Sequence, residues 1–407
     1  MAVAQGINKS VSIGIQVGLG TPNVTTGQIL RRKTSVFSAT RDMYESDEIV
    51  SHHQSTGSVY GLKKATGKID GLLSPLTYQL PIEGLLEALF VATTPLVLGT
   101  DVTTSATAPQ FVDASAGFLA GGIKVGDVGW FTGFTTTATG NNSRNFLVTA
   151  LTASNMTGVF LDGTVVSVKA PETGSVTFTV VGKKCKPPLT GHTNSYYTFE
   201  EWYSDITKSE LFPDCKIGQL AIGLPASGNS TISVDVVGLG ERTLASGAQQ
   251  VTTRAAETTT SVMGAINGFI YINGAAGTNI TGASLQISNS AAGIGAVIGS
   301  NSSPDVAVGR IKVSGSITGF FDSTTITAFY DAETKVGLAL VLAADNTATS
   351  AFMGFTMGKI AIGGDAPDDG EKGISRTYPF TAELNGDGGA ALAWDQTIIT
   401  VQDSAAA

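Results

Sequence analysis

Short segments of alternating apolar and polar residues, separated by turn residues, run along most of this chain of 407 residues. A period of two puts apolar side chains on one face of a β-strand, and frequent turn signals are typical of all-β domains. Two segments break this pattern. At 81–90, apolar residues recur as on one face of a short amphipathic helix, and 323–333 repeats that spacing more weakly. The pattern predicts a mainly β protein with two short helices.

Part of the pattern occurs twice. The segment "KIGQLAIG" (216–223) has the same skeleton as "TMGKIAIG" (356–363). Upstream of each lies one of the predicted helices. Upstream of each helix lies a similar strand, "ATGKIDGLLS" (65–74) in one case and "AVGRIKVSGSITGFF" (307–321) in the other. Because three elements match in the same order, we interpret the chain as two copies of one folding unit.

The first copy is longer than the second, and residues 98–183 account for most of the difference. This stretch consists of short Thr- and Gly-rich strands with aromatic residues of their own, which predicts a small inserted β-barrel. The predicted organisation is a first unit (1–97 and 184–243), the insert (98–183), a Ser/Thr/Ala-rich linker (244–262) and a second unit (263–407). Each unit is expected to be a β-sandwich or barrel with a short helix.

The chain is poor in charge. Only 14% of its residues are charged, against roughly 25% in an average soluble domain. This favours surfaces that partner subunits cover. The net charge is −9 and the pI about 4.9, and the basic clusters "LRRK" and "KKCK" are short, so a nucleic-acid clamp is not expected. An acidic wall would repel DNA, which suits a conduit.

No segment carries the pattern of an enzyme or a metal site. The chain has three histidines, and His52 and His53 lie near an acidic run without metal-ligand spacing. Glu200 and Glu201 are neighbours in a predicted strand, so they face opposite ways and cannot act as a carboxylate pair. The two cysteines form no CxxC motif. The prediction is no catalytic residue, no metal and no cofactor.

Three stretches resemble one known family, the tail tube proteins (major tail proteins) of long-tailed, non-contractile bacteriophages (siphophages). They are "ESDEIVSHHQSTGSVYGLKKATGKIDGLLSPLTYQLPIEGLLEALF" (45–90), "GIKVGDVGWFTGF" (122–134) and "VAVGRIKVSGSITGFF" (306–321). The first is similar to the strand and helix of the family's N-terminal half, and the second to a small barrel inserted into many members. The resemblance spans roughly residues 30–385 and involves packing and turn motifs.

This resemblance implies a structural virion protein without enzymatic activity. In the family, the inner sheets of neighbouring subunits join into a tube, rings stack around a tape-measure protein, and DNA later passes through. With two such units in one chain, a ring of three copies with pseudo-six-fold symmetry is expected. Tail terminator and tail-tip proteins are the other implied partners. The tail tube would assemble in the host cytoplasm, where cysteines stay reduced.

Two loops occupy matching places in the two units, 38–57 and 288–305. The resemblance implies that such loops reach the adjacent ring. The residues predicted to make contacts between rings are Arg41, Asp42, Glu45, Asp47, Glu48, Ser303 and Asp305. The inserted barrel is expected to decorate the outside of the tube, so that its deletion would leave tubes intact.

One alternative remains open on the sequence, a surface adhesin or fibre built of immunoglobulin-like domains. An adhesin would share the Thr/Gly-rich strands but would carry a secretion signal, whereas the N-terminal segment "MAVAQGINKSVSIGIQ" lacks a basic region followed by an apolar core. No uncharged apolar run reaches the length that spans a bilayer, so no membrane partner is expected.

Overall fold

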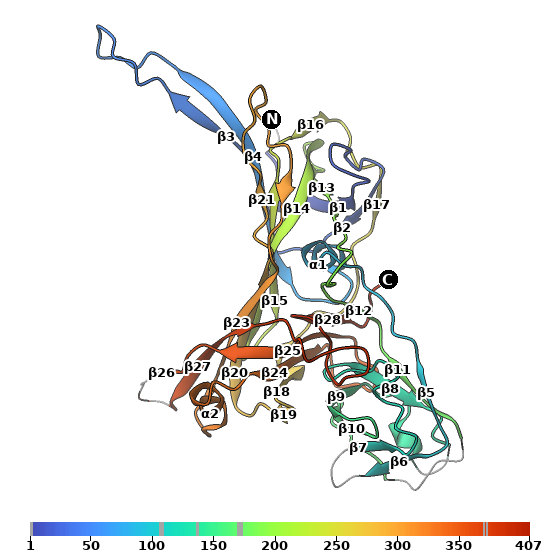
Figure 1. Cartoon of the computed structure of the whole chain (residues 1–407). Coiled ribbons are helices and arrows are strands. Elements are labelled where there is room, and N and C mark those ends of the chain that lie inside the picture. The colour runs from blue at the N-terminus through green and yellow to red at the C-terminus, as the bar shows by residue number, and fades with distance from the viewer. Residues whose placement is uncertain (1–2, 106–109, 136–137, 169–173, 369–370, 372) are drawn as a thin grey trace.

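A computed structural model describes residues 3–105, 110–135, 138–168, 174–368, 371 and 373–407. The protein is mainly β, and Figure 1 shows two groups of strands, one above the other, with a third, smaller group beside the lower one. The predicted fold class is confirmed. Nineteen of the described strands form one connected network, and seven others form a separate sheet.

The first unit occupies the upper part of Figure 1. Its elements are β1 (Lys9–Ile15), β2 (Thr26–Ile29), β3 (Thr34–Glu45), β4 (Ser58–Leu72), α1 (Gln79–Leu86), β12 (Lys183–Cys185), β13 (Tyr197–Tyr203), β14 (Lys208–Pro225), β15 (Thr231–Gly238), β16 (Thr243–Ser246) and β17 (Thr253–Ala255). Strand β15 has the alternation expected of a strand with one solvated face: Ile232, Val234 and Val236 are buried, and the residues between them are not.

Most of the second unit lies below it, and β21 of this unit lies in the upper part of the picture, beside β14. Its elements are β18 (Gly268–Ile272), β19 (Ala275–Ala276), β20 (Ile280–Ser288), β21 (Ala292–Gly293), β22 (Val306–Ala307), β23 (Lys312–Phe320), α2 (Thr325–Asp331), β24 (Val336–Ala343), β25 (Phe352–Ile362), β26 (Ala366–Asp368), β27 (Ser375–Ala382) and β28 (Thr400–Asp403). One hydrophobic cluster runs through both units, from Val11 to Val401.

The two units have the same strand pairing. In the first, the hydrogen-bonded order is β3-β4-β15-β14-β13-β1. In the second, the order is β20-β23-β27-β25-β24-β18. In both, the short helix follows the second strand of a hairpin. The predicted repeat of strand, helix and two strands is therefore present in the structure.

Gly218 and Gly358, which the segments 216–223 and 356–363 share, lie at irregularities in the pairing of two long strands. In β14 the register shifts between Ile217 and Gln219, so Gly218 is the extra residue of a β-bulge. Strand β14 pairs with β13 up to Cys215, with β15 from Cys215 onward and with β20 from Gln219 onward. In β25 the register to β24 is irregular around Gly358. A bulge of this kind bends the strand locally.

The inserted stretch forms the seven-stranded sheet, at the lower right of Figure 1. Its strands are β5 (Leu96–Gly99), β6 (Val102–Ser105), β7 (Gln110–Asp113), β8 (Val128–Thr132), β9 (Phe146–Leu151), β10 (Asn155–Phe160) and β11 (Val176–Val180). Phe111, Phe131 and Phe146 meet in its core, and the ring centroids of Phe111 and Phe131 are 3.9 Å apart. The sheet therefore has a hydrophobic core of its own, as predicted for a small barrel.

The stretch 244–262 is not a free connection. It contains most of β16 and all of β17, which pair with β14 and β2 of the first unit. The buried carboxylate of Glu200 accepts hydrogen bonds from the backbone N–H groups of Gln250 (2.6 Å) and Val251 (3.3 Å). The chain is thus held against the first unit before it enters the second.

Candidate assembly surfaces

The described residues contain no group of three or more His, Cys, Asp or Glu side chains placed to hold a metal ion. His52 and His53 lie exposed beyond β3, and His192 contacts Glu87 at 3.3 Å. Both cysteines are buried and unpaired, and burial raises the pKa of each thiol. That the protein has no catalytic residue, no metal and no cofactor stays a prediction.

Glu200 and Glu201 are both buried, and each has its own partners. Glu200 accepts a hydrogen bond from the Ser209 hydroxyl at 2.7 Å, in addition to those from the 250–251 backbone. Glu201 lies 2.6 Å from the Lys9 ammonium and accepts from the Tyr203 hydroxyl. Each carboxylate thus joins a different pair of strands, which agrees with the predicted opposite orientation.

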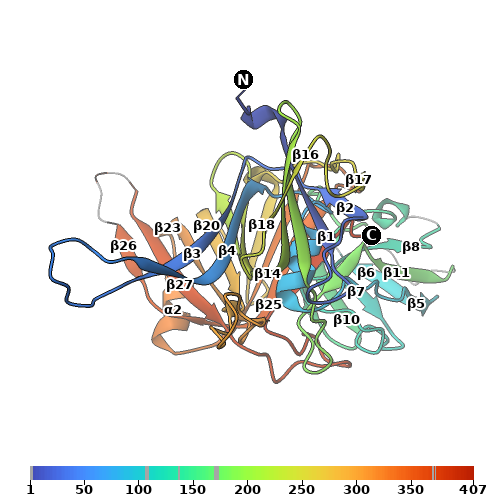
Figure 2. The same cartoon turned by 90° about the horizontal axis from the view of Figure 1, so that it is seen from above.

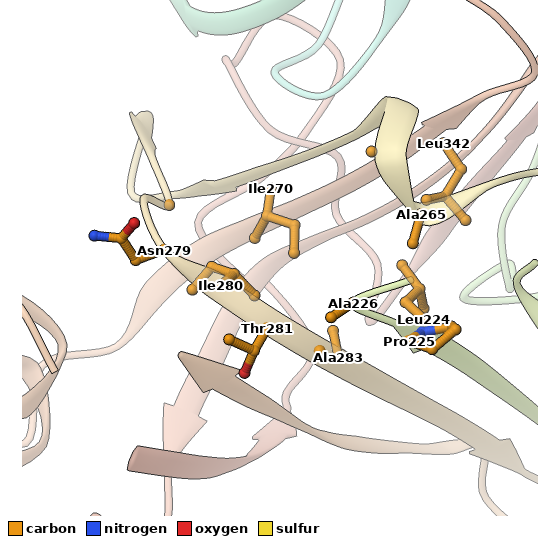
Figure 3. Close-up of a pocket in the computed structure, with 13 residues that line it drawn as sticks. Leu224, Pro225, Ala226, Ala265, Ile270, Asn279, Ile280, Thr281, Ala283 and Leu342 are labelled. Carbon is orange, nitrogen blue, oxygen red and sulfur yellow. The ribbon is translucent and has the colours of Figure 1, made fainter. Parts of the chain in front are cut away.

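One cavity of about 220 Å³ lies where the two units meet, at the end of β14 and the start of β20 (Figure 3). The labelled lining is mostly apolar, with Leu224, Ile270 and Ile280 facing the space, and its labelled polar side chains are Asn279 and Thr281. Its lining contains no titratable group, so it offers no acid–base chemistry.

The outer face of the main sheet is polar. Hydroxyl groups of neighbouring strands bond to each other across it: Ser38 to Thr66 (3.0 Å), Ser284 to Ser316 (2.8 Å) and Thr318 to Thr377 (2.9 Å). Such cross-strand pairs stabilise a sheet without an apolar cover. Two hollows of about 520 and 460 Å³ lie on this face, both lined in part by Thr34 and Asp70. The face is therefore a recessed polar surface.

The two units are joined edge to edge across this sheet. Residues Gln219–Pro225 of β14 pair antiparallel with Gly282–Ser288 of β20. On the polar face the Gln286 amide donates to the Gln219 side-chain oxygen at 2.7 Å, across the joint. The sheet of the first unit thereby continues into that of the second without a gap.

Both ends of this continuous sheet are edges. Strand β3 pairs only with β4, so its other side has no strand partner among the described residues. The Ser35 carbonyl instead accepts a hydrogen bond from the Lys9 ammonium at 3.0 Å. At the other end, β24 covers one side of β25 up to Ile360, and no described strand continues along that side. Uncovered edges of this kind are templates for another chain.

The hairpin β3–β4 extends beyond the body of the protein and projects sideways in both Figure 1 and Figure 2. Here we call residues 41–61 the arm. Of the residues predicted to make contacts, Asp42 pairs with Lys64 of the same hairpin at 2.9 Å. Arg41, Glu45, Asp47 and Glu48 are exposed and form no ion pair within the described residues.

The arm also exposes apolar side chains. Met43, Tyr44, Val59 and Tyr60 are each more than half exposed, and Ile49 is fully exposed. A two-stranded ribbon is marginally stable in water by itself. An exposed ribbon with charged and apolar side chains is a surface suited to contact another molecule.

Ser303 and Asp305, predicted in the matching loop, lie in a different environment. This loop packs back against the first unit: the Asp305 carboxylate accepts from the Tyr196 hydroxyl at 2.8 Å, and the Asn301 carbonyl accepts from the Lys63 backbone N–H. Ser303 is buried and bonds within the loop. The structure therefore does not bring these two residues together with the arm residues, and their role in contacts between rings stays a prediction.

The inserted barrel is bound tightly to the second unit. Val128, Leu147 and Leu161 form one buried cluster with Val341 and Phe352 of β24 and β25. The Gln402 side chain accepts from the Val128 N–H and donates to the Val128 and Val181 carbonyls. Figure 1 shows the barrel beside β25 and β28. These contacts were not predicted from the sequence, because no local pattern marks them.

Among the described residues, no helix has the length and apolar character needed to cross a membrane.

A search of curated proteins finds none that matches the chain. A family model described as phage tail tube protein matches residues 6–382, which is most of the chain. The match includes the first unit, the inserted barrel, the arm and the second unit as far as the end of β27. The chain therefore belongs to the phage tail tube protein family.

Proposed function

We propose that copies of this protein close into rings and that the rings stack into the hollow tail tube of a long-tailed, non-contractile phage. The observation that carries this proposal is the joint between β14 and β20, where one tube unit continues the sheet of another. A chain that already contains one such joint and ends in two uncovered edges can extend the same sheet around a closed ring.

A ring of three copies follows from the internal repeat. If neighbouring copies are related by the same rotation as the two units within one chain, each chain fills two equivalent positions of the ring. If the tube rings contain six such units, three chains would complete one ring with pseudo-six-fold symmetry. The low content of charged residues, 14%, suits a protein whose subunits bury much of each other's surface.

The polar face of the joined sheet is proposed to line the channel. It presents hydroxyl and amide groups that already bond to one another, such as Ser284 with Ser316 and Gln219 with Gln286. It presents few unpaired cations to neutralise phosphates, and the chain carries a net charge of −9. DNA is therefore expected to pass without sequence-specific or tight binding.

The expected partners are a tape-measure protein inside the tube, and tail terminator and tail-tip proteins at its ends. The protein would assemble in the host cytoplasm and remain in the virion tail, acting as a structural component and not as an enzyme. An adhesin or fibre of immunoglobulin-like domains is less well supported, because such domains do not need two units joined through one sheet.

Negative-stain microscopy of the purified protein tests the proposal. The expected result is hollow tubes or rings with a regular axial repeat, and end-on averages with three-fold or pseudo-six-fold symmetry. Isolated monomers or irregular fibres at high protein concentration would contradict it.

The arm is proposed to make the contacts between stacked rings, through Arg41, Asp42, Glu45, Asp47 and Glu48. Reversing two of these charges, with Asp47→Lys and Glu48→Lys, is expected to slow tube growth or abolish it. The two side chains are exposed, so the subunit should keep its circular dichroism spectrum and melting temperature.

A matched control removes the same charges without reversing them, with Asp47→Asn and Glu48→Gln. A graded loss of tubes, larger for the reversal than for the neutral variant, is expected if charge pairing across rings is involved. Tubes of normal length and number from the reversed variant would refute the role of these residues.

A further inference from the structure

We propose that the joint between neighbouring copies repeats the joint inside the chain: β3 of one copy pairs antiparallel with β25 of the next, with Thr34 opposite Ala361. This inference rests on the proposed ring and names the surface that closes it. The partner is a second copy of this chain, because the chain contains the same joint once already.

The register follows from two ladders of paired residues. Across the first unit, Ala221 pairs with Ser233, Ser233 with Asp70, and Asp70 with Thr34. Thr34 is the last residue of this ladder because β3 is the edge strand. All four residues lie on the polar face or reach it, since the neighbouring positions Leu220, Val234 and Ile69 are buried.

Across the second unit, Ala361 pairs with Thr381, Thr381 with Ser314, and Ser314 with Gln286. The strands occur in the same order as in the first unit. Ala361 therefore corresponds to Ala221, and Gln286 corresponds to Thr34. The match of Ala221 with Ala361 is the one that the segments "KIGQLAIG" and "TMGKIAIG" give independently.

The internal joint connects the two ladders by pairing Ala221 with Gln286. Replacing Ala221 by its counterpart Ala361, and Gln286 by its counterpart Thr34, puts Ala361 opposite Thr34. These two residues are the free ends of the combined ladder. This pairing preserves the faces of the sheet. Ile360 is buried and corresponds to Leu220, and Ser35, which follows Thr34 on β3, also points to the core side, next to Glu201.

The joint between copies would be shorter than the internal one. Strand β13 covers β14 only up to Cys215, which leaves Gln219–Pro225 for β20. Strand β24 covers β25 up to Ile360, so the free stretch begins at Ala361 and continues into Gly363 and Gly364. A shorter joint is consistent with rings that assemble from separately folded subunits.

A disulfide between the two predicted neighbours tests the register. The variant with Thr34→Cys and Ala361→Cys is assembled, oxidised and run on a denaturing gel without reductant. Each copy offers one thiol to each neighbour, so more than half of the protein is expected to migrate as covalent trimer, with no bands above three. The native Cys185 and Cys215 are buried and should not react.

The chain supplies matched controls. Ala221→Cys with Gln286→Cys, the equivalent pair of the internal joint, should form a bond within one chain and give no multimers. Val36→Cys with Ala361→Cys keeps the same face but shifts the pair by two residues, or about 7 Å, and should cross-link at least tenfold less. Either single variant should leave the protein monomeric on the gel.

The outcomes separate this proposal from the function on which it rests. Tubes that form normally but give no Thr34–Ala361 cross-link, or link better through Val36, would overturn the register and leave the tube intact. A series of cross-linked bands on the gel that ends at the hexamer supports the pairing but refutes a ring of three copies. Failure of the unmodified protein to form rings or tubes would refute the proposed function itself.

Discussion

Truncation of Phe352 to alanine is expected to reduce the free energy of unfolding by about 3–5 kcal/mol, which is a large part of the stability of a typical domain. Phe352 has no exposed surface and packs in the cluster that Val128, Leu147 and Leu161 of the barrel form with β24 and β25. The cavity would open between the two parts, where neither can close it alone. Urea denaturation of the unassembled subunit, followed by circular dichroism, measures the loss.

Phe320 provides the control for this experiment. It lies on β23 and is 51% exposed, so Phe320→Ala is expected to change the stability by less than about 1 kcal/mol. If Phe352→Ala costs no more than Phe320→Ala, the barrel and the second unit do not depend on each other.

The same cluster changes the expectation for the inserted barrel. From the sequence, its deletion is expected to leave tubes intact, because a domain that decorates the outside is not part of the tube wall. In the structure, deletion of residues 96–180 would uncover Val341 and Phe352 and would remove the Val128 backbone groups that bond to the Gln402 side chain. We therefore expect the deletion variant to be insoluble, even if the barrel lies on the outside of the tube.

The sequence located the helices but not their ends. The apolar pattern predicted a helix over 81–90, and the structure has α1 over Gln79–Leu86. Glu87 adopts a left-handed conformation, with φ 51° and ψ 38°, and ends the helix. The buried Glu83 carboxylate then accepts a hydrogen bond from the Phe90 N–H. The chain turns back while Leu89 and Phe90 keep a spacing that also fits a helix, so periodicity could not reveal the turn.

The repeat was identified correctly, but one of its alignments was not. Matching "GKID" with "GRIK" aligns Gly67 with Gly309, and therefore Asp70 with Lys312. The strand registers instead make Asp70 equivalent to Ser314, which is two residues further along the chain. A strand has a period of two, so a shift by two residues keeps every side chain on its face and leaves the apolar pattern unchanged. Only the pairing of residues across four neighbouring strands of each unit gives the correct alignment of the two units.

The candidate surfaces were predicted to different degrees. The arm was predicted from its position between two strands, and its residues Arg41, Glu45, Asp47 and Glu48 are exposed, while their role in contacts between rings stays a prediction. The loop of the second unit was predicted by analogy. Its Asp305 is instead bonded to Tyr196 of the first unit, a contact between residues more than one hundred positions apart. Local patterns carry no information on such long-range packing, which also decides where the two sheet edges stay uncovered.

The second large effect is expected at the base of the barrel, where Asp127 and Lys184 form a buried ion pair at 2.9 Å. Their side chains are 4% and 11% exposed. Replacing Lys184 by methionine, which is of similar length, leaves the Asp127 carboxylate buried without its cation. Removing one partner of a buried pair costs about 3–5 kcal/mol, and we expect a loss of that size at neutral pH, measured by urea denaturation.

The loss should depend on pH in a defined direction. Burial already raises the pKa of Asp127 in spite of the opposing attraction of Lys184, and removal of that cation raises it further. A carboxyl group whose pKa is higher in the folded state than in the unfolded state holds its proton more firmly when folded, so stability falls as the pH rises through this window. The deficit of Lys184→Met relative to the wild type is therefore expected to shrink as the pH is lowered from about 7 to about 5.

Two further variants separate the ion pair from general damage to β12. Lys183→Met changes the neighbouring residue, which faces the other side of the strand and has no ion pair among the described residues, and it should cost less than about 1 kcal/mol. The double variant Asp127→Asn with Lys184→Met removes both charges and should recover most of the loss, because the penalty comes from the unpaired carboxylate and not from the missing ammonium. A double variant as unstable as Lys184→Met alone would mean that the lysine stem, and not its charge, holds the barrel to the tube units.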